Sequence, residues 1–144
     1  MVEKDTIKLL RECDAGIKMG VSAINDVMGY VRNDQLRSSL NKSMGENRQI
    51  AHDLQKVLAD YNDKGKEPNP MAKEMSHIKT NMRLKMHRAD STIADLITDG
   101  CNMGIKSINR YMNQYKAADE RSKDLAQRLV GTEERLAFEI RQFL

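Results

Sequence analysis

The sequence predicts an all-α fold: an up-down-up-down four-helix bundle of two similar hairpins, with an extra short helix between them. Three observations predict it. The ten residues Gly16–Asn25 recur as Gly100–Asn109 with five identical positions, which indicates an internal repeat. Apolar residues recur three and four positions apart along most of the chain, as in helices that face a core. Aromatic residues make up only 4% of the chain, whereas it contains 10 methionines, a composition that suits an aliphatic core between helices.

The first hairpin is predicted at residues 5–62. One apolar stripe with helical spacing covers residues 7–31, and a second covers residues 36–61. Between the two stripes, Asn33 and Asp34 provide a turn and an N-cap for the second helix. Because the connection is so short, the two helices are expected to run antiparallel.

The second hairpin is predicted at residues 91–144. The capping-type residues Asp90–Thr92 precede an apolar stripe over residues 93–115, and Ala118–Asp119 then turns the chain. The last stripe covers residues 125–143. Each of the four helices has roughly 25 residues, or about 40 Å at 1.5 Å per residue, so their lengths match and a bundle can close.

The extra helix is predicted at residues 71–87, after the helix-breaking residues Gly65, Pro68 and Pro70. One side of it, which we call the methionine face, consists of Met71, Met75, Ile78, Met82 and Met86. The opposite side carries Lys73, Lys79, Arg83 and Lys85. Three interpretations are open. The helix packs on the bundle through the methionine face; the face contacts a second copy or another protein, mainly through Met71, Met75, Ile78 and Met82; or the helix lies on a membrane, which the absence of Trp and Phe disfavours.

Charge and hydropathy narrow the expected partners. The 24 basic and 21 acidic residues alternate along the chain, with a net charge of +3, whereas a nucleic-acid groove needs basic residues gathered on one face. No apolar run approaches the ~20 residues that cross a bilayer, and no signal core opens the N-terminus. Residues 1–144 are therefore expected to form one cytoplasmic domain that binds neither nucleic acid nor membrane. Cys13 and Cys101 are expected to be buried thiols, because no Cys-x-x-Cys spacing is present.

The duplicated hairpin, together with the segments Glu67–Lys73, Asp99–Gly104 and Tyr111–Asp119, resembles a bacterial ferritin-like family of unknown function. The resemblance covers nearly the whole chain. It implies a ferritin-like fold and no particular reaction. Metal-binding members of that superfamily hold two irons with a Glu from each of two helices and a Glu-x-x-His from each of the other two.

The di-iron pattern is incomplete in this chain. The third residue after Glu46 is glutamine, after Glu133 leucine and after Glu134 alanine, so neither Glu-x-x-His motif is present. The polar residues that share the register of the apolar stripes are Asp14, Asn47 and Glu133. Because an unpaired buried carboxylate is costly, these groups need partners. Two interpretations are open: a hydrogen-bonded polar layer that sets helix register, or a site for a divalent metal such as iron, manganese or zinc.

Other possible ligands fall outside the predicted core. Glu12, Asp95 and Asp99 lie on the sides of their helices away from the apolar stripes, so they are expected to be solvated charges. One histidine lies far from its stripe, and the other two, His77 and His87, belong to the extra helix. The sequence therefore offers no second set of metal ligands.

Four glycines are expected near mid-height of the bundle, one on each long helix. They are Gly20, Gly45, Gly104 and Gly131, and the first and third occupy equivalent positions of the repeat. Glycine within a helix costs on the order of 1 kcal/mol relative to alanine, so a compensating role is expected. Close approach of helix backbones and space for a ligand are the two interpretations.

Catalytic motifs are otherwise missing. The sequence has no P-loop and no nucleophile elbow, and the histidines are not arranged around a serine or cysteine. We therefore predict a non-enzymatic protein with a structural or protein-interaction role, which self-associates or binds another protein and needs no cofactor. The alternative is a divalent-metal-binding or redox bundle with a degenerate di-iron-type site.

Overall fold

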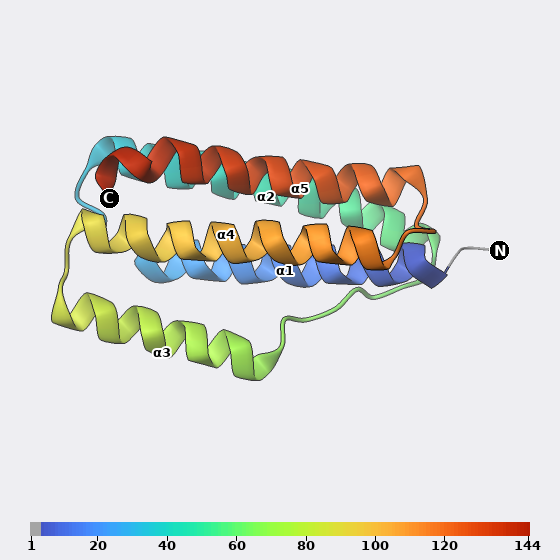
Figure 1. Cartoon of the computed structure of the whole chain (residues 1–144), viewed down its shortest axis with the longest axis horizontal. Helices are drawn as coiled ribbons and strands as arrows, with labels where there is room; N and C mark the ends of the chain where they lie inside the picture. The colour runs from blue at the N-terminus through green and yellow to red at the C-terminus, as the bar shows by residue number, and fades with distance from the viewer. Residues whose placement is uncertain (1–3) are drawn as a thin grey trace.

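The computed structural model describes residues 4–144 (Figure 1). The α-helices are α1 (Lys4–Met28), α2 (Asp34–Asp60), α3 (Pro70–Met86), α4 (Asp90–Gln114) and α5 (Glu120–Ile140), and a short 3-10 helix, η1, follows at Arg141–Phe143. Within residues 4–144 there is no strand, and no helix is long and apolar enough to cross a bilayer. The all-α prediction is confirmed. Residues 1–3 of the predicted domain lie outside the described residues.

Short polar side chains determine where three of the helices begin. Asn33 caps α2, as predicted, because its Oδ1 accepts hydrogen bonds from two backbone N–H groups of the first turn. Asn69 caps α3 in the same way, and Asp119 caps α5 by accepting one hydrogen bond, from the Ser122 N–H. The predicted cap at the start of α4 does not form: Ala89 occupies the cap position, and Asp90 is already the first residue of the helix.

Asp90 instead shows the directions of the helices. Its carboxylate accepts hydrogen bonds of 2.9 Å from the backbone N–H groups of Arg32 and Asn33, just before α2. The helices α2 and α4 therefore begin at the same end, and α1, α2, α4 and α5 run up, down, down and up (Figure 1). The predicted up-down-up-down order is wrong, because α3 and the segment before it lead the chain back along the molecule between α2 and α4.

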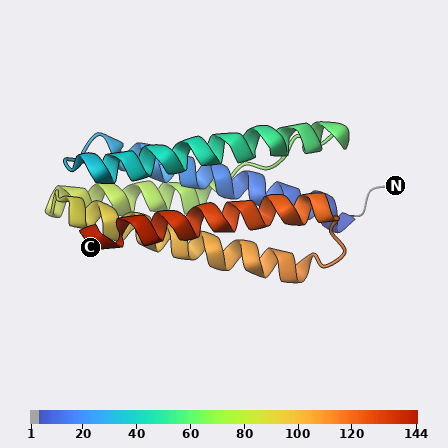
Figure 2. The same cartoon turned by 90° about the horizontal axis from the view of Figure 1, so that it is seen from above.

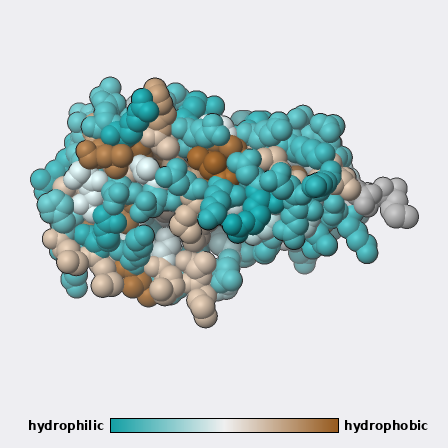
Figure 3. All heavy atoms as spheres, viewed as in Figure 1, coloured by the Kyte–Doolittle hydropathy of each residue, from teal (hydrophilic) through white to brown (hydrophobic). Residues whose placement is uncertain are grey.

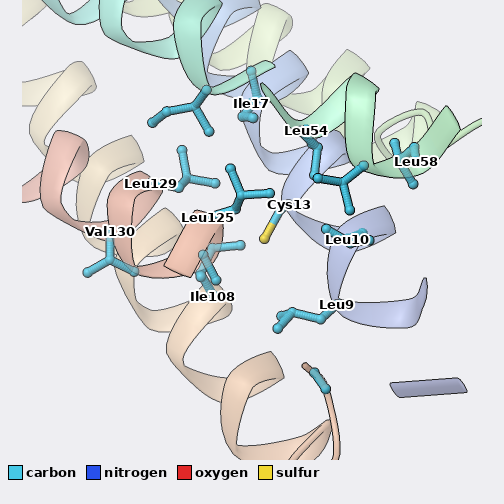
Figure 4. Packing of buried hydrophobic residues seen from close by; sticks show 14 residues of the cluster. Leu9, Leu10, Cys13, Ile17, Leu54, Leu58, Ile108, Leu125, Leu129 and Val130 are labelled. Carbon is cyan, nitrogen blue, oxygen red and sulfur yellow. The ribbon is translucent and has the colours of Figure 1, made fainter. Parts of the chain in front are cut away.

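The four long helices, α1, α2, α4 and α5, lie side by side (Figures 1 and 2). Their inner sides form two apolar clusters. The first cluster surrounds Cys13 and includes Leu10, Leu54 and Leu125, which are fully or almost fully buried (Figure 4). The second cluster is made by Ile24, Val27, Leu36, Leu40, Ile97, Leu136 and Ile140, among others. The predicted aliphatic core is thus present, and both cysteines are free and buried.

Candidate functional site

The helix α3 packs on α1 and α4 (Figure 1). The side of α3 that is turned toward them is mostly polar. Its only buried residues are Thr80 and Leu84. The partly buried residues of α3 are all polar: Lys73, Ser76, His77 and Arg83. Polar contacts, together with Leu84 in the second apolar cluster, therefore hold α3 on the long helices.

Acidic residues of α4 face the basic side of α3. Arg83 Nη2 lies 2.5 Å from Asp95 Oδ2, and Lys79 Nζ lies 3.8 Å from Asp99 Oδ2. The side chains of Asp95 and Asp99 are 47% and 52% exposed, in keeping with the predicted solvated charges, and each also has a basic partner on α3. Glu12 is less exposed and forms an ion pair with Lys66, which follows α2. Lys79 and Arg83 of α3 are thus complementary in charge to Asp99 and Asp95 of α4.

A hydrogen-bonded chain joins α3 to α1. His77 Nδ1 lies 2.5 Å from Asp26 Oδ2, and His77 Nε2 lies 3.5 Å from Ser22 Oγ. Residues far apart in sequence thus bring a histidine beside a serine, whereas the sequence predicts no histidine arranged around a serine or cysteine that could attack. The arrangement nevertheless lacks what acyl transfer requires: the Ser22–His77 contact is long, and the backbone N–H groups around Ser22 donate within α1 rather than to an oxyanion. The contacts of His77 with Asp26 and Ser22 hold α3 in position on α1.

The methionine face points outward. Its exposed fractions are 76% for Met71, 63% for Met75, 45% for Ile78, 59% for Met82 and 84% for Met86. In Figure 3, beige and brown spheres gather along the edge of the molecule that α3 forms in Figure 1. The interpretation that α3 packs on the bundle through this face is therefore wrong. The physical reason is that the opposite side of α3 has partners on the long helices: Leu84 lies in the second apolar cluster, His77 lies beside Asp26, and Arg83 lies beside Asp95.

Asp14, a predicted metal-ligand candidate, holds the segment that leads to α3. This buried carboxylate accepts hydrogen bonds from Gln55 Nε2 (3.1 Å), Lys18 Nζ (3.0 Å) and the backbone N–H of Lys66 (3.0 Å). Gly65 is required beside it: its φ is +80°, and a Cβ atom there would lie 2.1 Å from Asp14 Oδ2. Asp14 is fully engaged by these donors, so it anchors the chain between α2 and α3.

Asn47 and Glu133 occupy equivalent positions of the two hairpins. Asn47 is thirteen residues after the start of α2, and Glu133 is thirteen residues after the start of α5. Along its helix, each lies between residues of the first cluster and residues of the second. The buried Asn47 amide donates to the Ser43 carbonyl oxygen, whereas its Oδ1 has no hydrogen-bond partner within the part of the chain that the structure describes. The hydrogen-bonded polar layer therefore stays a prediction for these two residues.

The carboxylate of Glu133 lies between the two repeated glycines. A Cβ atom on Gly20 of α1 would lie 3.5 Å from Oε1, and one on Gly104 of α4 would lie 3.7 Å from Oε2. Both distances are ordinary van der Waals contacts, so neither glycine is required to make room for this side chain. A Cβ atom on Gly45, by contrast, would have no described heavy atom within 4 Å beyond its own local backbone.

Burial controls the protonation of this acid and of the neighbouring thiol. Burial raises the pKa of Glu133 to about 7, and a hydrogen bond with Cys101 opposes this rise. Burial and the nearby Glu133 also raise the pKa of the Cys101 thiol. Cys101 is thus a neutral thiol at pH 7 and lacks the thiolate that a nucleophile or metal ligand requires.

A di-iron-type donor set does not fit these residues. Asp14 is held by three donors, and its hydrogen-bond partners are different from those of Asn47 and Glu133. Across residues 4–144, no three His, Cys, Asp or Glu side chains form a group that could hold a metal ion. The three candidates therefore divide into Asp14, which anchors the α2–α3 segment, and two separate mid-helix residues, Asn47 on α2 and Glu133 on α5.

Comparison with known proteins adds no relative. No protein-family model, curated protein or solved structure matches this chain. The ferritin-like resemblance therefore rests on the residues that carry it.

Proposed function

We propose that this chain is a non-enzymatic protein-interaction module built on a ferritin-like four-helix bundle of α1, α2, α4 and α5. Two features support the proposed bundle. Ferritin-like folds have one long crossover connection between their hairpins, and the segment between α2 and α4, which contains α3, has that role here. The two repeat copies, Gly16–Asn25 and Gly100–Asn109, lie on α1 and α4, which pack against each other.

The outward methionine face is the observation that carries the proposed interaction. Burying a Met or Ile side chain contributes about 1.5–3 kcal/mol, whereas an exposed ion pair contributes about 0–1 kcal/mol. A helix that served only to cover the bundle would gain more by turning its methionines inward. Clustered exposed apolar side chains mark interaction sites, and unbranched methionine adapts to the shape of a partner. We infer that a protein partner covers the methionine face.

Site-specific photo-crosslinking in intact cells tests this function. A photoreactive amino acid replaces Met75 in one variant and, as the matched control, Met103 in another, because Met103 is an equally exposed methionine on α4. We expect protein adducts at position 75, which disappear when Ile78→Asp is added, and far fewer adducts at position 103. Equal yields at the two positions, or no adduct at position 75, would contradict the proposed function.

The second candidate, a metal-binding or redox bundle, has weaker support. The strongest support for a metal site comes from the Asn47 Oδ1 acceptor, which has no described partner, and from the carboxylate of Glu133. These two residues supply only one ionisable side chain. Elemental analysis of protein purified without chelators separates the two functions. Stoichiometric iron, manganese or zinc that is lost in Glu133→Gln would favour the metal-binding bundle.

A further inference from the structure

The spacing of the methionine face is that of a coiled-coil seam. Met71, Met75, Ile78 and Met82 are separated by four, three and four residues, which are the d, a, d and a positions of a heptad. A seam with this spacing fits an identical helix, because each a and d side chain packs between four side chains of the facing helix.

The contacts of α3 within its own chain fit the same heptad. The b, c and f positions, which face away from the partner in a two-stranded coiled coil, are the ones that pack on α1 and α4. These partly or fully buried residues are Ser76 and Arg83 (b), His77 and Leu84 (c), and Lys73 and Thr80 (f). The helix therefore uses one half of its circumference internally and leaves a complete seam outside.

The charges beside the seam are complementary in one orientation. In a parallel pair, a g residue faces the e residue five positions further along the partner, so Glu74 would face Lys79 of the second copy, twice by symmetry. An antiparallel pair that aligns the same apolar residues places Glu74 opposite Asn81 and Lys79 opposite Ala72, and gains no ion pair. Glu74 is exposed, and Lys79 has only the 3.8 Å contact with Asp99.

We propose that the methionine face binds a second copy of this chain, α3 against α3, in a parallel, twofold-symmetric coiled coil. This inference rests on the proposed function, and it names the partner. A twofold interface uses the same surface on both copies, which a self-complementary seam provides. About two heptads are too short to form a stable coiled coil from free peptides, but each α3 is already folded on its own molecule, so the cost of ordering it has been met.

Cysteine cross-linking of the purified full chain tests the orientation. In a parallel pair each a position faces itself, so Met75→Cys and Met82→Cys each yield a disulfide-linked dimer under mild oxidation. In the antiparallel pair position 75 faces position 78, and neither single variant cross-links efficiently. Met103→Cys and the wild type are the controls: the first is exposed on another helix, and the second has only buried cysteines. Cross-linking of Met75→Cys at the level of Met103→Cys overturns the proposal.

Charge reversal tests the proposed ion pairs by sedimentation velocity. Glu74→Lys places like charges together twice in the dimer, and we expect the dimer dissociation constant to rise about tenfold. Adding Lys79→Glu restores opposite charges and is expected to recover most of the loss. A helical spectrum for each variant shows that it has folded.

The outcomes separate this inference from the proposed function. A wild-type protein that remains monomeric at millimolar concentration overturns self-association, while adducts to another protein at position 75 in cells would leave the interaction function standing. Unchanged dimerisation in Glu74→Lys overturns the parallel pairing.

Discussion

The helices α1 and α3 use their apolar residues in opposite ways. In α1, apolar residues such as Leu10, Ile17 and Ile24 are buried in the two clusters. Most of its charged residues face outward, whereas Asp14 contacts the segment before α3 and Asp26 contacts α3 itself. In α3, basic and polar residues face the other helices and the methionine face is exposed. An amphipathic pattern therefore predicts a helix and its two sides, but the neighbouring surface decides which side is covered.

The largest expected difference between the two regions is in how much a buried or an exposed apolar side chain contributes to the free energy of unfolding. Leu54 is fully buried in the first cluster, so Leu54→Ala is expected to lower the free energy of unfolding by about 2–5 kcal/mol. Met75→Ala removes an exposed side chain and is expected to change it by less than about 0.5 kcal/mol in dilute solution. Chemical denaturation monitored by circular dichroism compares the two variants. A loss above about 2 kcal/mol for Met75→Ala would show that the methionine face is buried within the chain.

The next effect concerns the acid between the long helices. The pKa of Glu133 is about 7 in the folded protein, above the usual 4.5, so the folded state holds its proton more tightly than the unfolded state. The contribution of Glu133 to the free energy of unfolding therefore falls as the pH rises from about 4.5 to 7, and it is lowest above pH 7. Glu133→Gln is expected to remove this dependence and to raise the free energy of unfolding by about 1–3 kcal/mol above pH 7.

Denaturation curves between pH 4.5 and 8 check the Glu133 prediction. Glu134→Gln is the matched control, because it changes the same chemical group on the exposed neighbouring residue. A Glu133→Gln variant with the same pH dependence as wild type, or one destabilised at pH 8, would contradict the assigned role of burial.

The smallest effect is expected where α3 joins α1. Asp26→Asn keeps the shape of the side chain but removes the charge beside His77, a partly exposed pair that contributes about 0–1 kcal/mol. The loss should be local, with faster amide hydrogen exchange in α3 and unchanged exchange in α5. Exchange that accelerates equally in both helices would mean that α3 is not held separately by this contact.

The sequence predicted the helices well because their signals are local. The cap at Asn33 and the breaks at Gly65 and Pro68 depend on neighbouring residues alone, and the structure has helix ends beside them. The direction of α4 depends instead on how far the segment with α3 travels, which no local pattern records. The helical register of the sequence also places Asp14 among the apolar residues of its stripe. The segment around Gly65 that Asp14 contacts became evident only in three dimensions.

The rotation of α3 had a signal that single-helix reasoning does not use. Asp95 and Asp99 are four residues apart, as are Lys79 and Arg83, and a short connection joins the two helices. Matched pairs of opposite charge on antiparallel neighbours predict an inward basic side. The contact between Ser22 and His77 had no comparable signal in the sequence, because the two residues are far apart along it.

Methionine oxidation tests most directly whether α3 exposes an apolar face that a partner covers. Peroxide is applied to the wild-type chain at low and high protein concentration, and peptide mass spectrometry follows Met75 and Met82, with the buried Met44 and the exposed Met103 as internal references. In dilute protein we predict that Met75 and Met82 oxidise as fast as Met103. At high concentration they should become several-fold slower while Met103 does not. Rates for Met75 and Met82 that match Met44 in dilute protein would contradict the account.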